Sequence, residues 1–421
     1  MGKNRFWIPK DKTIKFNENE TETVGSGNRE GTKETFILVS LTLGHVGVHW
    51  FQQLWPVIIP SLKATLGLSN VELGTLTAVK QFMGGPLNLP SGFLADQFQK
   101  HTSVILAFAF LGFGISHFLV ARAPTLAWMI PCVALLGVGT ALWHPAAIGT
   151  LSRRFPQRRG TALAVHGVGA SVGDTIGPVV IGFLLLSLPW QRLLELQMIP
   201  AVLIAIALWV GLRPIFKDQN STRSSIGSYL GDVKSLMGHR VVLAIIGVNI
   251  LCGMARLTII TFLPIFIQDD LGYSAFGLGF YWGLLHVMGV VSQPVMGYLS
   301  DKFGRKAILL PSLIVFGLLY LALAIAESGL QLILVIAGLG LFFYALVNVT
   351  QATVMDVASH RVQASTMGIT GIFTQLASLP APVFAGFLVT RFGTEASFIY
   401  AGIVTLIAAL LLAMIRVPKS N

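Results

Sequence analysis

The sequence predicts an all-α membrane protein in which twelve transmembrane helices form two six-helix bundles, with both termini in the cytoplasm. Three observations support this fold class. The 421-residue chain is 54% hydrophobic and only 11% charged, whereas soluble domains carry about 25% charged residues. Its apolar residues gather in twelve continuous runs of roughly 20 residues, the length that crosses about 30 Å of hydrocarbon. The second half of the chain repeats a pattern found in the first.

The twelve apolar runs are read as helices because membrane strands alternate polar and apolar residues over about ten positions. The runs cover residues 36–59, 71–94, 102–121, 126–151, 161–186, 193–212, 241–267, 276–299, 307–326, 330–354, 365–389 and 397–415. The polar start of the chain lacks the apolar core of a cleaved signal peptide. We therefore expect a cytoplasmic tail at 1–35, an N-terminal bundle at 36–212, a cytoplasmic linker at 213–240 and a C-terminal bundle at 241–421.

The orientation follows from lysine and arginine counts in the predicted loops. The tail, the C-terminus and the loops on their side hold 23 of these residues, whereas the opposite loops hold 4. This asymmetry places both termini in the cytoplasm. It also explains the net charge of +11 without a nucleic-acid partner. We expect a monomer that spans a lipid bilayer several times, in a bacterial inner membrane.

An internal repeat relates the two halves. An offset of 205 residues aligns 66–98 with 271–303 without a gap, and 11 of the 33 pairs are identical. The matches include a shared G-x-L-x-D at Gly92 and Gly297. Two parallel six-helix repeats are the layout of carriers that rock two bundles around a central site.

The repeated segment resembles a signature of the major facilitator superfamily, and the resemblance covers residues 36–415. GYLSDKFGRK, residues 297–306, looks like the signature after helix 8, and GFLAD, residues 92–96, begins the matching one after helix 2. The resemblance implies a transporter without a cofactor. We expect the glycines to permit close backbone approach and the carboxylates to pair with loop arginines when the cytoplasmic gate shuts. The expected gating residues are Gly92, Asp96, Gly297, Asp301 and Arg305.

Further motifs are similar to the fosmidomycin-resistance branch of efflux proteins. They are GHVGVHWFQQLWPVIIP in the first run, WHPAA in the fourth and GVGASVGDTIGP in the fifth. The last also resembles a helix 5 motif associated with antiporters. His49 and Ala146 stand where that branch is expected to carry acids, and Asp174 is unusual in the third motif. The substrate of that branch is therefore not carried over.

Three charged residues lie well inside predicted spans: Lys80, Arg256 and Asp174. A charge at the bilayer centre costs about 2.5–3.5 kcal/mol on insertion scales, so each is a candidate functional residue. Lys80 lies about ten residues from either end of its run, too far for snorkelling. It either meets substrate or forms a salt bridge with Asp174. Because a guanidinium binds carboxylate or phosphate bidentately, two cations against one anion predict an anionic substrate.

Polar and aromatic residues in the spans complete the predicted site. The candidate substrate-binding residues are Lys80, Arg256, His49, Gln52, His144, Tyr344, Asn348, Gln351, Trp282 and His286. His166 and Asp174 are the candidate proton-coupling pair, since histidine changes charge within the physiological pH range. His45 and His49, four residues apart, form a conceivable metal pair. No carboxylate or thiolate cluster accompanies them, so we predict no metal site.

These features favour a secondary active transporter that moves a small organic anion by alternating access, with protons as the coupling ion. The chain has no ATP-binding GxxxxGK[ST] sequence. Efflux by antiport is slightly favoured, and anion uptake by proton symport is the alternative. Efflux of neutral or cationic drugs, with Asp174 as the binding acid, is a further alternative. A membrane receptor or sensor is the alternative from another functional class. An enzyme is not expected.

Overall fold

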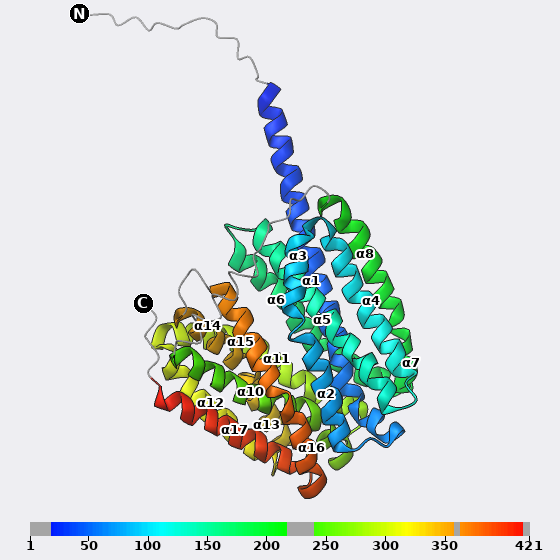
Figure 1. Ribbon diagram of the computed structural model, residues 1–421, viewed down its shortest axis with the longest axis vertical. Helices are drawn as coiled ribbons and strands as arrows, with labels where there is room; N and C mark the ends of the chain where they lie inside the picture. The colour runs from blue at the N-terminus through cyan, green and yellow to red at the C-terminus, as the bar shows by residue number, and fades with distance from the viewer. Residues whose placement is uncertain (1–17, 217–239, 358–362, 416–421) are drawn as a thin grey trace, which may run out of the picture.

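A computed structural model describes residues 18–216, 240–357 and 363–415, and these residues are helical apart from short connections (Figure 1). The first half contains α1 (Glu18–Leu66), α2 (Asn70–Gly84), α3 (Asn88–Gln97), η1 (Gln99–His101), α4 (Thr102–Ala121), α5 (Leu126–Arg154), α6 (Arg159–Leu184), α7 (Trp190–Leu196) and α8 (Met198–Phe216). The second half contains α10 (Arg240–Ile265), η2 (Phe266–Asp270), α11 (Ala275–Phe303), α12 (Arg305–Leu323), α13 (Leu330–Phe343), α14 (Ala345–Val357), α15 (Gln363–Ser378), α16 (Pro380–Phe392) and α17 (Glu395–Met414).

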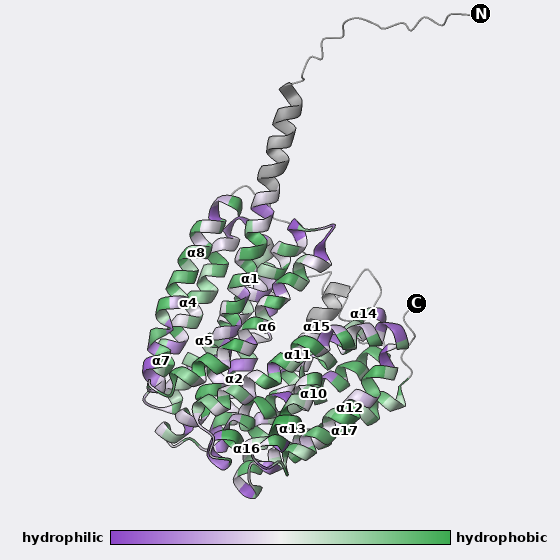
Figure 2. Cartoon of the chain, turned by 180° about the vertical axis from the view of Figure 1, so that it is seen from behind, coloured by the Kyte–Doolittle hydropathy of each residue, from purple (hydrophilic) through white to green (hydrophobic). Residues whose placement is uncertain are grey.

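Ten helical segments in the described part of the chain are long and apolar enough to cross a membrane. The predicted run 36–59 lies inside α1, and the run 71–94 is divided between α2 and α3. The count of twelve and the cytoplasmic placement of the termini therefore stay predictions. Large apolar side chains are exposed on both halves, among them Trp128, Leu203, Val291 and Leu334. Figure 2 shows hydrophobic residues along the helices of both halves. A surface of this kind suits contact with lipid.

Besides the run 193–212, which is divided between α7 and α8 at Gln197, three of the predicted continuous runs are interrupted. The first break separates α2 from α3 at Gly85 to Leu87, where Pro86 lacks the backbone N–H that a continuing helix needs. The second falls at Tyr344, between α13 and α14, and the third at Leu379, just before the proline that begins α16. Irregular backbone at membrane depth is tolerated where it is buried in protein or lines a cavity. Gly84 and Tyr344 both line the cavity described below.

Glycines bring α6 against α1 in the first half. A Cβ added to Gly169 would lie 2.3 Å from the carbonyl oxygen of Thr42, and one added to Gly173 would lie 2.6 Å from that of Val46. Such distances leave no room for a side chain, so small residues set the separation of the two helices. The close packing places Asp174, the residue after Gly173, beside the His49 turn of α1.

The two halves meet through two pairs of helices at the end away from the termini. A Cβ on Gly74 of α2 would lie 2.2 Å from the carbonyl oxygen of Pro382 on α16. A Cβ on Gly279 of α11 would lie 2.2 Å from that of Pro178 on α6. The two glycines are partners in the 205-residue repeat. At the other end, where both termini lie, the helices of the two halves spread apart (Figure 1).

The two signature glycines, Gly92 and Gly297, do not make the close backbone approach that the sequence predicts. A Cβ on Gly92 would meet only Pro145 Cβ, at 3.6 Å, and one on Gly297 would meet nothing within 4 Å. The prediction that both glycines permit close backbone approach is therefore wrong for this conformation. The reason is that both lie toward the end at which the halves are apart.

Candidate functional site

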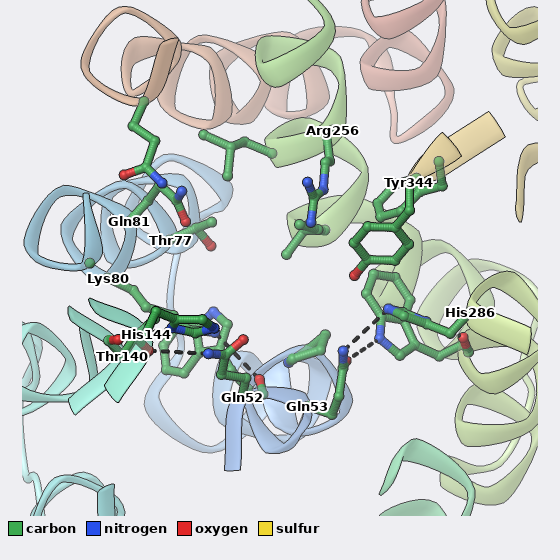
Figure 3. A pocket seen from close by; sticks show the side chains of 18 of the residues that line it. Gln52, Gln53, Thr77, Lys80, Gln81, Thr140, His144, Arg256, His286 and Tyr344 are labelled. Atoms are coloured by element: carbon green, nitrogen blue, oxygen red, sulfur yellow. Dashed lines mark hydrogen bonds between the residues drawn. The ribbon is translucent and has the colours of Figure 1, made fainter. Parts of the chain in front are cut away.

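A cavity of about 400 Å³ lies between the two halves (Figure 3). The first half contributes residues of α1, α2, α3 and α5, and the second half residues of α10, α11, α15 and the α13–α14 break. The lining residues are Gln52, Gln53, Trp55, Pro56, Thr77, Lys80, Gln81, Gly84, Asn88, Thr140, His144, Arg256, Leu257, Ile260, Trp282, His286, Phe343, Tyr344 and Gln375. A concave, mostly preformed site with a few polar groups is the usual form of a small-molecule site.

Both predicted cations line this cavity, one from each half. Lys80 Nζ donates to the carbonyl oxygen of Gln52 at 3.4 Å. The Arg256 guanidinium carbon lies 4.6 Å from the ring centre of Tyr344 and 5.1 Å from that of Phe343. Its Nε is buried without a hydrogen-bond partner. Cation–π contacts fix the guanidinium plane but do not neutralise its charge.

The two cations are not paired with acids in the part of the chain that the structure describes. None of the ion pairs found there involves Lys80 or Arg256. The described lining residues include no aspartate or glutamate. The alternative of a salt bridge between Lys80 and Asp174 is therefore not what the structure shows, and the cavity wall carries a positive surplus.

Asp174 is held by two residues of α1. His49 Nδ1 donates to Asp174 Oδ1 at 2.8 Å, and Gln53 Nε2 donates to the same oxygen. His49 and Gln53 are four residues apart and so lie on one face of the helix. Both face α6 where Gly173 allows a close approach. A buried carboxylate needs such partners, because an isolated charge in this setting costs several kcal/mol.

Gln53 also connects the two halves. Its Oε1 accepts a hydrogen bond from Trp282 Nε1 of α11 at 2.7 Å, and its Nε2 lies 3.2 Å from His286 Nε2. His286 Nδ1 donates to the carbonyl oxygen of Trp282 at 2.7 Å, which leaves Nε2 of a neutral ring as the acceptor. Each polar atom of the Gln53 amide is thus in use, with one hydrogen on Asp174 and the other on His286. We name Gln53, Asp174, Trp282 and His286 the bridging network.

Sequence reasoning missed Gln53. Glutamine is common at helix–helix contacts, and it carries no charge that would mark it as costly. The available signal was its position four residues after His49, on the face that meets Asp174. Thr77, Gln81 and Gln375 were missed as well. The first two flank Lys80 on the same helix, so they could have been included with it.

The predicted pairing of His166 with Asp174 is wrong, because His49 and not His166 contacts Asp174. The His166 ring instead stacks on His45, with ring centres 4.0 Å apart, and neither of its ring nitrogens has a hydrogen-bond partner. Two residues eight positions apart on one helix are separated by about 12 Å along its axis. The imidazole that contacts Asp174 comes from α1.

The structure divides the remaining predicted substrate residues into two groups. Gln52, His144, Tyr344, Trp282 and His286 line the cavity. Asn348 and Gln351 do not; both are exposed on α14, beyond the break at Tyr344. Asn348 Nδ2 donates to Gln293 Oε1 at 2.7 Å.

The predicted gating residues form contacts within the second half. Arg305 Nε donates to Asp356 Oδ2 at 2.7 Å, and Arg305 Nη1 donates to Ser300 Oγ at 2.7 Å and to Asp301 Oδ1. These contacts join α11, α12 and α14. The side chain of Asp96, the equivalent acid of the first half, lies outside the described residues. Arg305 therefore pairs with carboxylates in the second copy of the signature while the halves are apart at this end, so the pairing is not confined to the shut gate that we expected.

Comparison with known proteins shows relatives throughout the chain. An uncharacterized MFS-type transporter, MJ1317 of Methanocaldococcus jannaschii, is 22% identical over 379 residues, covering 85% of this chain and 89% of its own length. The multidrug resistance protein MdtG of Klebsiella pneumoniae is 24% identical over 341 residues, covering 78% and 80%. Among solved structures, a bacterial homologue of the human lysosomal transporter Spinster, inward-facing and unoccupied, superimposes with a TM-score of 0.76. Its identity is 15%, with 90% of this chain and 96% of that chain covered.

The family model of the Major Facilitator Superfamily matches residues 41–294 and 287–421. These segments include the helices on both sides of the cavity and the whole bridging network. Together with the ten long apolar helical segments in the described residues, the match establishes a multi-pass integral membrane protein. The chain therefore belongs to the Major Facilitator Superfamily, a family of transporters rather than enzymes.

Proposed function

We propose that this chain is a secondary active transporter that moves a small organic anion across the membrane by alternating access. One observation carries the proposal: among the described residues, two cations, one from each half, line the central cavity, and neither forms an ion pair with an acid. A buried charge is costly unless it is paired. A bound anion would supply the missing charge to both cations together, and would link the two halves as it does so.

The two cations suit different tasks in binding an anion. Arg256 presents a planar fork of donors, positioned by the rings of Tyr344 and Phe343, and such a fork matches a carboxylate or phosphonate. Lys80 is a point charge on a flexible stem, backed by a single long hydrogen bond to Gln52. Gln52, Thr77 and Gln81 offer neutral hydrogen bonds nearby. A small anion with one carboxylate or phosphonate group fits this arrangement.

The conformation supports a cavity that opens to the cytoplasm. The halves are packed through glycines at the end away from the termini and spread apart at the end that carries them. The positive-inside rule places the termini in the cytoplasm, and twelve spans are consistent with termini on one side. We propose an inward-facing carrier in a bacterial inner membrane, acting as a monomer. Membership in the fosmidomycin-resistance-like branch stays a prediction.

Protons are the proposed coupling ion. Asp174 is an embedded carboxylate whose contacts reach both halves through Gln53. Coupling requires only that protonation and substrate binding favour different conformations by a few kcal/mol. His166 is not proposed as a partner of Asp174 in proton coupling, because its ring stacks on His45. Efflux by antiport is favoured over uptake by symport, since a relative is named as a multidrug resistance protein.

A thermal-shift screen of the purified protein tests the substrate class. Carboxylates, phosphonates, sulfonates and organic cations are compared on the native chain and on Lys80→Ala and Arg256→Ala. Lys302→Ala, which removes an exposed cation away from the cavity, is the matched control. We expect one class of anion to stabilise the native chain and the control but neither cavity variant. Stabilisation by organic cations alone would instead identify a drug efflux carrier.

Counterflow of the stabilising compound in proteoliposomes then tests transport itself. A carrier exchanges labelled for unlabelled substrate across the membrane, whereas a receptor binds without exchange. Exchange that depends on Lys80 and Arg256 is the expected result. Binding without exchange would favour a receptor or sensor and contradict the proposal.

A further inference from the structure

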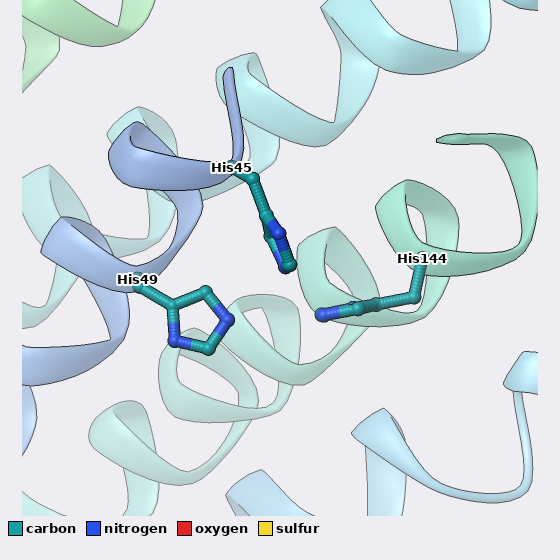
Figure 4. Close-up of side chains that lie close together, drawn as sticks. All are labelled: His45, His49 and His144. Carbon is teal, nitrogen blue, oxygen red and sulfur yellow. The ribbon is translucent and has the colours of Figure 1, made fainter. Parts of the chain in front are cut away.

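Three histidines from two helices converge beside the bridging network. His45 and His49 lie on α1 and His144 on α5, and one ring nitrogen from each lies within 4.8 Å of the other two (Figure 4). Their ring centres are 4.7 Å, 5.4 Å and 6.1 Å apart, and each pair of rings is close to perpendicular. The three rings are not stacked on one another, and one nitrogen of each faces the space that they share.

Each of these rings has its Nδ1 occupied by an oxygen. His49 Nδ1 donates to Asp174 Oδ1 at 2.8 Å, His45 Nδ1 to the carbonyl oxygen of His166 at 2.9 Å, and His144 Nδ1 to that of Thr140 at 3.0 Å. Because an oxygen acceptor fixes the hydrogen on Nδ1, the lone pair of each neutral ring resides on Nε2. The cluster therefore holds three Nε2 lone pairs and no hydrogen to place between them.

The innermost of these atoms has no partner within the protein. His45 is only 6% exposed, and its Nε2 is buried without a hydrogen-bond partner. A buried polar atom left unpaired costs about 1–3 kcal/mol. Three lone pairs facing one another add electrostatic repulsion to that cost. A cation that accepts all three would remove both penalties together.

We propose that His45, His49 and His144 form a binding site for a divalent first-row transition metal ion of the zinc class. Neutral imidazole is a preferred ligand of zinc, copper and nickel ions. Three histidines with a fourth position left to water or an anion form a known catalytic zinc arrangement. Metal-binding histidines generally donate their other ring nitrogen to a carboxylate or backbone carbonyl. All three rings here already make that contact, one to Asp174 and two to carbonyl oxygens.

The approach needed to bind the ion is small. Zinc–nitrogen distances of about 2.05 Å in a tetrahedral site put two ligand nitrogens about 3.3 Å apart. The nitrogens now lie within 4.8 Å of one another, so binding requires them to approach by up to about 1.5 Å. Asp174, bonded to His49, supplies a negative charge next to the ion. The inference does not depend on the proposed transport function, although His144 also lines the cavity.

Zinc titration of the purified, tag-free, full-length protein tests the site. Isothermal calorimetry is expected to show one Zn²⁺ per chain. His144→Ala and His45→Ala each remove a ligand and should weaken binding by more than about 100-fold. Asp174→Asn changes only the partner of a ligand and should weaken it by about 10–100-fold. His101→Ala, an exposed histidine outside the cluster, is the matched control and should bind as the native chain does.

A second measurement on the native chain guards against variants that fold poorly. X-ray absorption at the zinc edge should show three nitrogen ligands at about 2.0–2.1 Å. Absence of stoichiometric binding would overturn the proposal. So would a coordination shell that contains sulfur, or zinc affinity that survives both alanine variants. Because these measurements are made without a membrane gradient, their failure would leave the carrier proposal intact.

Discussion

The two interfaces that join the halves share their geometry but differ in chemistry. In the α2–α16 interface Gly74 packs on the carbonyl of Pro382, and in the α6–α11 interface Gly279 packs on that of Pro178, with the same distance of 2.2 Å for an added Cβ. The bridging network lies beside the second interface alone. Near the first, Asn70 Nδ2 donates to Thr390 Oγ1 at 3.4 Å.

The repeat explains both the likeness and the difference. Because Gly74 and Gly279 are partners in the repeat and pack on Pro382 and Pro178, the position four residues before Pro382 is the structural counterpart of Asp174. That position is Ser378, which is buried and donates to the carbonyl oxygen of Thr374 at 2.7 Å on its own helix. The halves thus retain equivalent glycines for packing, while the carboxylate is present in one copy only. We infer that both interfaces serve the rocking motion and that one of them senses charge.

The largest expected effect comes from filling the glycine contacts. Gly279→Ala and Gly74→Ala each insert a Cβ 2.2 Å from a carbonyl oxygen, and overpacking of this kind costs about 1–3 kcal/mol. Each variant should open its interface and shift the conformational equilibrium by about 5- to 150-fold. Spin labels at Lys100→Cys and Lys302→Cys, in a chain whose Cys132 and Cys252 are replaced by alanine, report the separation at the other end.

Gly297→Ala is the control for this experiment. Its added Cβ meets nothing within 4 Å, so the distance between the labels should stay unchanged. Both interface variants should shorten that distance, because one end of a rocking carrier closes as the other opens. A result in which Gly279→Ala and Gly297→Ala behave alike would contradict the role we give to the interface.

The second-largest expected effect distinguishes the α6–α11 interface from the α2–α16 interface. Gln53→Leu leaves the N–H of Trp282 and one contact of Asp174 unmade, which costs about 1–3 kcal/mol for buried groups. The same label pair should move closer in this variant. Combination with Gly74→Ala should be additive, whereas combination with Gly279→Ala should not, because those two changes act on one interface. Asn70→Ala is the control at the other interface and should have the smaller effect.

A smaller effect is expected when the cavity cations are exchanged with charge retained. Arg256→Lys loses the planar contact with Tyr344 and Phe343, worth about 0.5–2 kcal/mol. The affinity for the stabilising anion should fall by about 2- to 30-fold, as measured by its concentration dependence in the thermal-shift assay. Lys80→Arg should change the affinity less, since Lys80 contacts no ring. Equal losses in the two variants would argue against a carboxylate or phosphonate group at Arg256.

The smallest effect is expected at the Arg305 contacts. Arg305 bonds Asp301 and Asp356 within the second half, where the Asp301 side chain is exposed and the Asp356 side chain is partly exposed. Exposed ion pairs contribute about 0–1 kcal/mol. Arg305→Ala should therefore lower the melting temperature slightly and leave the label distance unchanged. A large change in that distance would show that Arg305 already holds the halves together in this conformation.

Much of the architecture was predictable because hydrophobic length is a strong local signal. Nearly every apolar run coincides with one helix or with two consecutive ones. The break at Pro86 follows from a missing N–H, whereas the break at Tyr344 has no comparable signal in the residues around it. Helix interruptions of that kind depend on neighbouring helices that the local sequence does not specify.

The sequence predicts the site residues whose charge is costly to bury in a membrane, but it does not single out the uncharged ones. Lys80 and Arg256 were identified because a charge inside the membrane is energetically costly. Both line the cavity. Gln53 carries no such cost. His144 joins His45 and His49 only through packing of α5 on α1, and the spacing of residues within α1 contains no information about that contact.

Few amino acids can occupy position 53 if the bridging network is to persist. The carbonyl oxygen and both amide hydrogens of Gln53 have separate partners, so rotating the amide by half a turn would set hydrogen against hydrogen at Trp282. Glutamate has the right length but would direct an oxygen at Asp174. Asparagine carries the right group but is one carbon short. Among homologues that keep aspartate, tryptophan and histidine at the other three places, position 53 should therefore vary least of all the uncharged positions of α1.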